Sequence, residues 1–372
     1  MARTEIPSSN RQPTGTTYGG RYGGGSGGRA VPSRPSGRPR RTGPRWGRIA
    51  LLGVALLAVV GLVVGGCGVA YLAGLDGKLR RTDAFAGLSG RPEKAVDGTR
   101  NILILGSDSR DGTAPDGGSA IGERSDAIMV LHLPENGEKA YVISIPRDTY
   151  VFVPEYQGHG GRKAKINAAF AWGGIPLTVM TVERFTGVRI DSVVKMDFKG
   201  FKAMTDAVGG VDVTVDKTVY DPRSKRTFKA GVNHLDGAAA LDYVRQRYNL
   251  PRGDFDRMQR QQIFLRALMQ KATDSGTLSH PLKLKAFLDA STKAMTVDED
   301  FSLRGTALAF RGIRPGDLAF ITSPHLGSQN VNGESVVVSD KANAASLWEA
   351  VDKDTVGDWL ADHPANNATR GR

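Results

Sequence analysis

Acidic side chains stand at the ends of two apolar runs in the first third of the sequence. Asp108 follows the run 102–105 after Gly106, and Asp126 stands just before the run 128–131. If the two runs are neighbouring strands, the aspartates form a carboxylate pair. Such a pair suits a hard cation such as Mg²⁺, which takes its other ligands from phosphate and water. The alternative is that each aspartate only forms a turn or a cap.

An arginine beside an acid ends the third apolar run, 140–145. Pro146 lacks a backbone N–H, so the strand must stop there and Arg147 can project from the end of the sheet next to Asp148. An arginine in this position either binds an anionic ligand or forms a surface ion pair with a nearby acid.

Arginines recur in a third stretch further along the chain. Arg245 and Arg247 are two residues apart, which in an extended segment directs both guanidinium groups to the same side. Arg257 and Gln261 share one face of a helix that begins near Asp254. Converging guanidinium groups repel one another unless an anion with several oxygens neutralises them, and phosphate matches their paired donors. The alternative is a solvated helix face with short-range ion pairs.

Strands and helices that position these three stretches are predicted from residue 99 to residue 360. Short apolar runs predict strands, and longer runs with a 3.6-residue period predict helices. The expected strands are 101–107, 126–133, 140–145, 193–196, 211–215, 318–322 and 335–338. The expected helices are 165–172, 177–185, 201–208, 255–273, 282–295, 302–311 and 343–351. Their alternation predicts an α/β fold, a layered α-β-α domain around a mixed central sheet.

The N-terminal region carries most of the positive charge. Residues 1–48 contain ten arginines and one acid, which account for +9 of the formal net charge of +12. Eleven glycines and six prolines in the same stretch leave almost no large apolar side chains, so we expect a disordered basic tail. The rest of the chain is close to neutral, which argues against nucleic acid as a partner.

Residues 49–75 predict one transmembrane helix. They contain no charged side chain and exceed the ~20 residues that a membrane-spanning helix needs. Arginines crowd the N-terminal flank, which places that flank in the cytoplasm and the C-terminal bulk outside. We therefore expect a single-pass cell-membrane protein with a stalk at 76–98, an extracytoplasmic domain at 99–360 and a flexible tail at 361–372. The single cysteine, Cys67, excludes an internal disulfide.

The order of the charged motifs resembles that of the LytR-CpsA-Psr family. The resemblance runs from about residue 99 to residue 273 and rests on the motifs Asn101–Arg110, Arg124–Asp126, Ser144–Asp148, Lys165–Asn167, Tyr243–Arg247 and Asp254–Gln262. In that family a membrane helix presents an extracytoplasmic α/β domain, which transfers an anionic glycopolymer from a polyprenyl pyrophosphate carrier to peptidoglycan. The resemblance therefore implies an enzyme with these two partners.

The resemblance also implies roles for single residues. Asp108 and Asp126 match the positions that hold Mg²⁺ in the family, so Mg²⁺ is the expected cofactor. One departure is Ala127, which stands where a threonine commonly follows the second aspartate. The expected pyrophosphate-binding residues are Arg110, Arg124, Arg147, Lys165, Arg245, Arg247, Arg257 and Gln261.

The implied reaction is a displacement at phosphorus by an acceptor hydroxyl. Arg147 and Mg²⁺ are expected to stabilise the charge that develops on phosphate oxygens, and either Asp126 or Asp254 accepts the hydroxyl proton. Two alternatives remain at this point. A polyprenyl pyrophosphate hydrolase would use the same residues with water as the acceptor, and a membrane-bound regulator would need a cytoplasmic domain.

Overall fold

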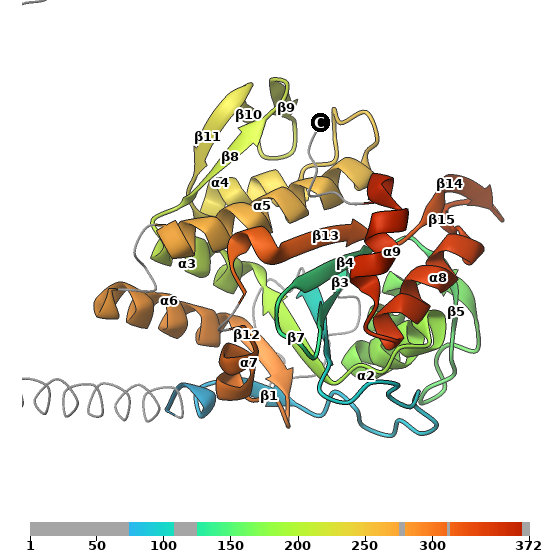
Figure 1. Cartoon of the computed structure of the whole chain (residues 1–372). Coiled ribbons are helices and arrows are strands. Elements are labelled where there is room, and N and C mark those ends of the chain that lie inside the picture. The colour runs from blue at the N-terminus through green and yellow to red at the C-terminus, as the bar shows by residue number, and fades with distance from the viewer. Residues whose placement is uncertain (1–73, 108–124, 275–279, 311–312, 367–372) are drawn as a thin grey trace, which may run out of the picture. The chain divides into compact units, whose positions relative to one another are not determined.

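The computed structural model describes residues 74–107, 125–274, 280–310 and 313–366. At its centre is a seven-stranded sheet in the order β1-β12-β7-β2-β3-β4-β13 (Figure 1). Strands β2, β4, β7 and β13 run in one direction and β1, β3 and β12 in the other, so the sheet is mixed, as the sequence predicts. The strands are β1 Arg80–Thr82, β2 Arg100–Ser107, β3 Ser125–Leu133, β4 Ala140–Ile145, β7 Ser192–Asp197, β12 Met295–Asp298 and β13 Leu318–Thr322.

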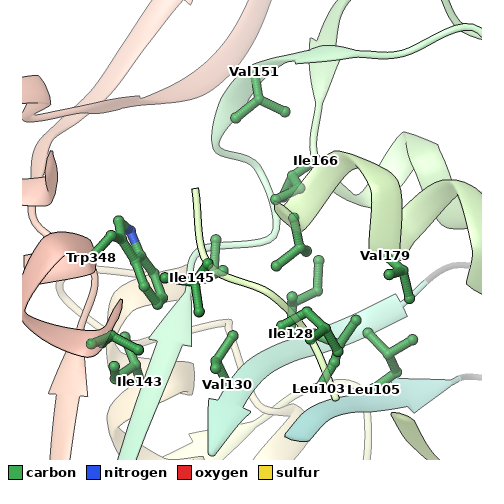
Figure 2. Packing of buried hydrophobic residues seen from close by; sticks show 14 of the residues in the cluster. Leu103, Leu105, Ile128, Val130, Ile143, Ile145, Val151, Ile166, Val179 and Trp348 are labelled. Carbon is green, nitrogen blue, oxygen red and sulfur yellow. The ribbon is translucent and has the colours of Figure 1, made fainter. Parts of the chain in front are cut away.

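Both faces of this sheet are covered, because side chains alternate between the faces along each strand. Leu103 and Leu105 of β2 belong to a core with α2 (Asn167–Thr186), α8 (Lys341–Asp352) and α9 (Val356–Asp362). Ile102, which precedes Leu103 and so points the other way, belongs to a core on the opposite face with α5 (Asp254–Asp274) and α7 (Leu303–Phe310). Figure 2 shows the first core, where sheet residues meet helix residues such as Val179 and Trp348. The predicted α-β-α layering is confirmed.

A third cluster of buried residues lies beside α5. It joins α5 to α3 (Phe198–Ala207), α4 (Gly237–Arg245) and β8 (Val211–Val215). Among the described residues, four short strand pairs lie outside the main sheet, and of their eight strands only β8 and β15 were predicted, at 211–215 and 335–338. The pairs are β5 Tyr150–Val153 with β6 Arg162–Lys165, β8 with β11 Gly231–Leu235, β9 Val219–Asp221 with β10 Arg226–Phe228, and β14 His325–Val331 with β15 Glu334–Ser339.

The two helices predicted at 165–172 and 177–185 form one kinked element, α2. Gly173 and Gly174 depart from helical angles between the two halves, and Gly174 has φ 63°, a conformation that glycine adopts readily. Pro176 restarts the helix, since proline is tolerated in a first turn. The first half begins at Asn167, because Lys165 is still the last residue of β6.

Residues 76–98, predicted as a stalk, are instead built into the folded domain. β1 pairs in parallel with β12 at the edge of the central sheet. Arg91 donates to both carboxylate oxygens of Glu183 in α2, with Nη2 2.7 Å from Oε1, and Lys94 lies 3.0 Å from Asp191. These contacts join the segment to elements more than 90 residues away. Its only strand, β1, has three residues, which is too short for a sequence pattern to reveal.

Helical structure also continues beyond residue 360 at the C-terminal end. α9 reaches Asp362, and Trp359 stacks on His363 with ring centroids 4.3 Å apart and donates from Nε1 to Ser346. The predicted tail at 1–48 and nearly all of the predicted span at 49–75 lie outside the described residues. Within residues 74–366 as described, no helix combines the length and apolar character needed to cross a membrane.

Candidate active site

Four parallel strands of the central sheet, β2, β4, β7 and β13, end at one edge, and the antiparallel β3 begins there. β2 ends at Ser107, β4 at Ile145 and β13 at Thr322. β3 runs in the opposite direction between β2 and β4, and so begins at the same edge. The segments that follow β2 and β4 and precede β3 carry the first two charged stretches of the sequence. The topology therefore gathers them, as predicted.

The start of β3 is irregular at Asp126. Gly106 pairs with Ala127 and Ser107 pairs with Ser125, so the register shift leaves Asp126 without a Cα partner on β2. A bulge of this kind redirects a side chain and is common next to active sites. The side chain of Asp126 itself is not among the described parts of the chain.

Arg147 lies in a tight turn directly after β4. The turn is closed by a hydrogen bond from Thr149 N to Pro146 O, and the carbonyl of Arg147 accepts from Asn167 N at the start of α2. The carbonyl of Asp148 accepts from Val337 N of β15. The backbone at Arg147 is thus fixed by two other elements, which directs its side chain toward the start of α5.

Asp254, the first residue of α5, contacts two arginines. Nη2 of Arg257 lies 2.9 Å from one carboxylate oxygen of Asp254 and 3.1 Å from the other. Nε of Arg147 lies 3.6 Å from Oδ1 of Asp254 and 3.8 Å from Oδ2 of Asp148. The Arg257 side chain is 3% exposed, so its positive charge is held within the protein by this carboxylate. These contacts unite the second and third charged stretches.

Burial raises the pKa of the Asp254 carboxyl above its ordinary value, although Arg257, Arg147 and Arg247 oppose that shift and Asp148 adds to it. The carboxylate therefore holds a proton more readily than an exposed aspartate does. A raised pKa brings a carboxylate closer to the working range of a general base.

Arg245 and Arg247 stand at and just after the end of α4, and the prediction of an extended segment around them is wrong for Arg245. Arg245 is the last residue of α4, and the chain becomes extended only at Gln246. The guanidinium of Arg245 lies 4.3 Å from the ring centroid of Phe198. Arg247 is partly buried and acts electrostatically on Asp254. The two arginines therefore lie on either side of the end of α4 and do not share one extended segment.

Two glutamines fix α5 against its neighbours. Gln261 donates to the carbonyl of Val244 in α4, at 3.4 Å. Gln262, 2% exposed, donates to Ser144 Oγ at 3.0 Å and lies 3.3 Å from Thr322 Oγ1. The sequence analysis overlooked Gln262, whose partners lie at the ends of β4 and β13. No local sequence pattern marks Gln262, because its burial and its partners appear only in the fold.

The remaining predicted site residues divide into two groups. Lys165 is described, and its Nζ lies 3.6 Å from a carboxylate oxygen of Glu334 in β15. The structure does not bring Lys165 into contact with the arginine cluster. Asp108, Arg110 and Arg124 lie outside the described residues.

The donor set for a metal ion is only partly described. No group of three or more His, Cys, Asp and Glu side chains that could hold an ion occurs among the residues that the structure describes. The described backbone does place Asp126 and the residue before Asp108 at adjacent strand ends, which fits a site built from two carboxylates.

A mixed α/β sheet with arginines and a buried carboxylate at one edge has the donors that suit an oxyanion with several charges. The comparison with known families makes this specific. The model of the LytR_cpsA_psr family matches residues 76–353, and the chain belongs to that family. The resemblance seen in the motifs is confirmed, and the match begins within the segment that had been predicted as a stalk.

Two curated relatives cover most of the described domain. The cell wall biosynthesis protein LcpA of Corynebacterium glutamicum is 32% identical over 322 residues, 77% of this chain and 62% of LcpA. The polyisoprenyl-teichoic acid–peptidoglycan teichoic acid transferase TagU of Bacillus cereus is 38% identical over 205 residues, 55% of this chain and 63% of TagU. The matches thus span a little over three fifths of each relative.

Among solved structures, TagV of B. subtilis has the same fold. It superposes with a TM-score of 0.56 at 29% sequence identity, over 70% of this chain and 98% of that chain. The agreement covers the α/β domain described above.

Proposed function

We propose that this chain transfers an anionic glycopolymer from a polyprenyl pyrophosphate carrier to peptidoglycan. The observation that carries the proposal is the Arg147–Asp254–Arg257 cluster at the edge where β2, β4 and β13 end. It combines cations that match pyrophosphate oxygens with a carboxylate that can accept a proton. The printed names of LcpA and TagU, a cell wall biosynthesis protein and a teichoic acid transferase, support the same chemistry.

In the proposed reaction, a sugar hydroxyl of peptidoglycan attacks the phosphorus on the glycan side of the pyrophosphate. A new oxygen–phosphorus bond forms, the bond to the bridging oxygen breaks, and polyprenyl monophosphate leaves. Arg147, Arg245, Arg247 and Arg257 stabilise charge on the phosphate oxygens. The hydroxyl proton passes to Asp254 or Asp126.

We further propose that Asp108 and Asp126 hold Mg²⁺. When bound, Mg²⁺ supplies positive charge to phosphate oxygens without any proton transfer. The location that goes with this function is the outer face of the cell membrane, with residues 49–75 as the anchor and a lipid-linked donor in the same membrane.

The test is transfer by the full-length protein with a polyprenyl pyrophosphate glycan donor, with and without a soluble peptidoglycan acceptor. The glycan is expected on the acceptor, with loss of transfer in EDTA and recovery with Mg²⁺. Asp126→Ala is expected to abolish transfer while thermal melting changes little. Equal release of glycan with and without acceptor would instead identify a hydrolase, and full activity after chelation would exclude the proposed Mg²⁺ role.

A further inference from the structure

A groove of about 600 Å³ lies beside the candidate active site. Its walls are strand β5, the C-terminal end of α2 and one face of α8, which lie together on the right of Figure 1. The volume falls within the range of ~300–1,000 Å³ that ligand sites occupy. We call it the α8 groove, defined by Tyr150, Phe152, Lys163, Arg184, Lys341 and Trp348.

Aromatic side chains and cations line the α8 groove together. Phe152 is 39% exposed on the outer face of β5, and the guanidinium of Arg184 lies 4.8 Å from its ring centroid. Lys163 and Lys341 are exposed at the walls. Exposed aromatic surface next to charge is costly to leave in water and typical of a binding site.

The lining limits what can occupy the groove. An aliphatic chain does not suit it, because three cations would lose hydration without gaining a partner. A polyphosphate does not suit it either, because Glu349 and Asp352 face the same space. A sugar chain suits it, since its C–H faces pack on aromatic rings and its oxygens accept from Lys and Arg. Glu349 is paired with Lys353 at 2.6 Å, so the three cations of the groove outnumber its remaining acid, Asp352. Carboxylates on the sugar chain would balance this positive charge.

The floor of the groove offers a further donor. Trp348 is 2% exposed, and its buried Nε1 has no hydrogen-bond partner within the described part of the chain. Leaving such a donor unpaired costs ~1–3 kcal/mol. Because this atom is buried, a ligand oxygen would reach it only after the side chains that cover it move.

β5 links the groove to the candidate active site along the chain. Tyr150, at the start of β5, is three residues after Arg147 and pairs with Lys165. The carbonyl of Asp148 is fixed by Val337 N, which holds this turn against the strand that leads into α8. We infer that the α8 groove binds the peptidoglycan glycan strand, rich in carboxylate and N-acetyl groups, and so guides the acceptor hydroxyl to the arginine cluster. This inference rests on the proposed function, whose acceptor it locates.

The test is binding of soluble, uncrosslinked peptidoglycan glycan fragments to the full-length protein in detergent, measured by calorimetry. Phe152→Ala and the double variant Arg184→Glu/Lys341→Glu are each expected to weaken binding at least tenfold. Lys285→Glu on α6 (Pro281–Ala294) makes the same type of charge change at an exposed residue away from the groove, and is expected to bind as the wild type does. Thermal melting confirms that each variant is folded.

Steady-state transfer gives a second readout. Groove variants are expected to raise KM for the acceptor at least tenfold and to leave donor binding unchanged. Wild-type affinity in both groove variants, or weakening by the charge changes but not by Phe152→Ala, would overturn the inference. Glycan binding that depends on the groove, together with no transfer under any condition, would retain the groove as a glycan site and reject the proposed reaction.

Discussion

Asp254 is held by two arginines that the proposed substrate would also bind. Arg257 and Arg147 both lower the pKa of Asp254, against the rise that burial causes. When an oxyanion draws Arg147 away from this carboxylate, the pKa of Asp254 rises further. Under the proposed function, the donor therefore increases the basicity of the group that accepts the acceptor proton. Without substrate, the ion pairs with Asp254 hold Arg147 and Arg257 in position and compensate their charge.

Replacing Arg257 by lysine should slow transfer about tenfold to a hundredfold. Lysine keeps the charge but cannot present two donors in one plane, and a charge-assisted hydrogen bond contributes ~1.5–3 kcal/mol. Arg252→Lys is a matched control just before the same helix, because Arg252 is 61% exposed and pairs with Asp256. Single-turnover transfer of the two variants is the measurement. Equal rates for Arg257→Lys and wild type would contradict the assignment of Arg257 to the substrate site.

The rate of transfer should fall at acidic pH, and the midpoint of this fall should lie above the ordinary aspartate pKa of about 3.9. If Asp254 is the proton acceptor of the proposed reaction, its carboxylate is the active form, and activity rises as pH rises through its raised pKa. Arg147→Gln removes a cation that lowers this pKa, and should move the midpoint to higher pH as well as slowing transfer. The measurement is kcat/KM against pH for both proteins. A midpoint at the same pH in both would mean that another group titrates.

The elements that the sequence predicts well are those with long apolar patterns. β2, β3, β4 and α5 bury whole faces, so their alternation or helical period is visible in the residues. β1 and β12 are short and begin with charged or mixed residues, and only their pairing across more than 200 residues makes them part of the sheet. In the site, Arg147 and Arg257 were identified through motif order, but the partnership of Gln262 with Ser144 depends on contacts that no local pattern contains.

Removing Arg91 should test how firmly the segment before β2 is joined to α2. Arg91→Ala leaves the 3% exposed carboxylate of Glu183 without its cation, and such a loss costs ~3–5 kcal/mol. Adding Glu183→Gln to this variant should restore part of the stability, because the buried charge is gone. Lys353→Ala, which breaks the exposed pair with Glu349, should change stability much less, because water and salt screen such a pair. Denaturant unfolding measures all three, and equal losses for Arg91→Ala and Lys353→Ala would show that the buried pair adds nothing.

The charge distribution over the whole chain separates a basic N-terminal region from a nearly neutral remainder, with the uncharged run 49–75 between them. This arrangement agrees with a domain that meets an anionic glycopolymer at a local site rather than over its entire surface. The family match to residues 76–353 begins directly after that run.

Protease protection should establish the orientation. A tag at the C-terminus is expected to be cleaved in intact protoplasts, and a tag before Arg45 only after lysis, because the positive-inside rule predicts that the denser cationic flank stays in the cytoplasm. Protection of the C-terminal tag in intact cells would reverse the orientation and place the domain away from peptidoglycan.

The order of strands in the central sheet has a consequence for how the chain folds. Among the strands of the central sheet, β12 and β13 are synthesised last, yet they pair with β7 and β4. The sheet is therefore completed only when residues 295–322 have emerged from the ribosome. Until then β7 and β4 present open edges, which pair readily with other chains. Contacts of such long sequence separation also slow folding. A truncation before Met295 would therefore yield an aggregation-prone fragment even though it retains Arg147, Asp254 and Arg257, and the native fold depends on late synthesis of the far end of the domain.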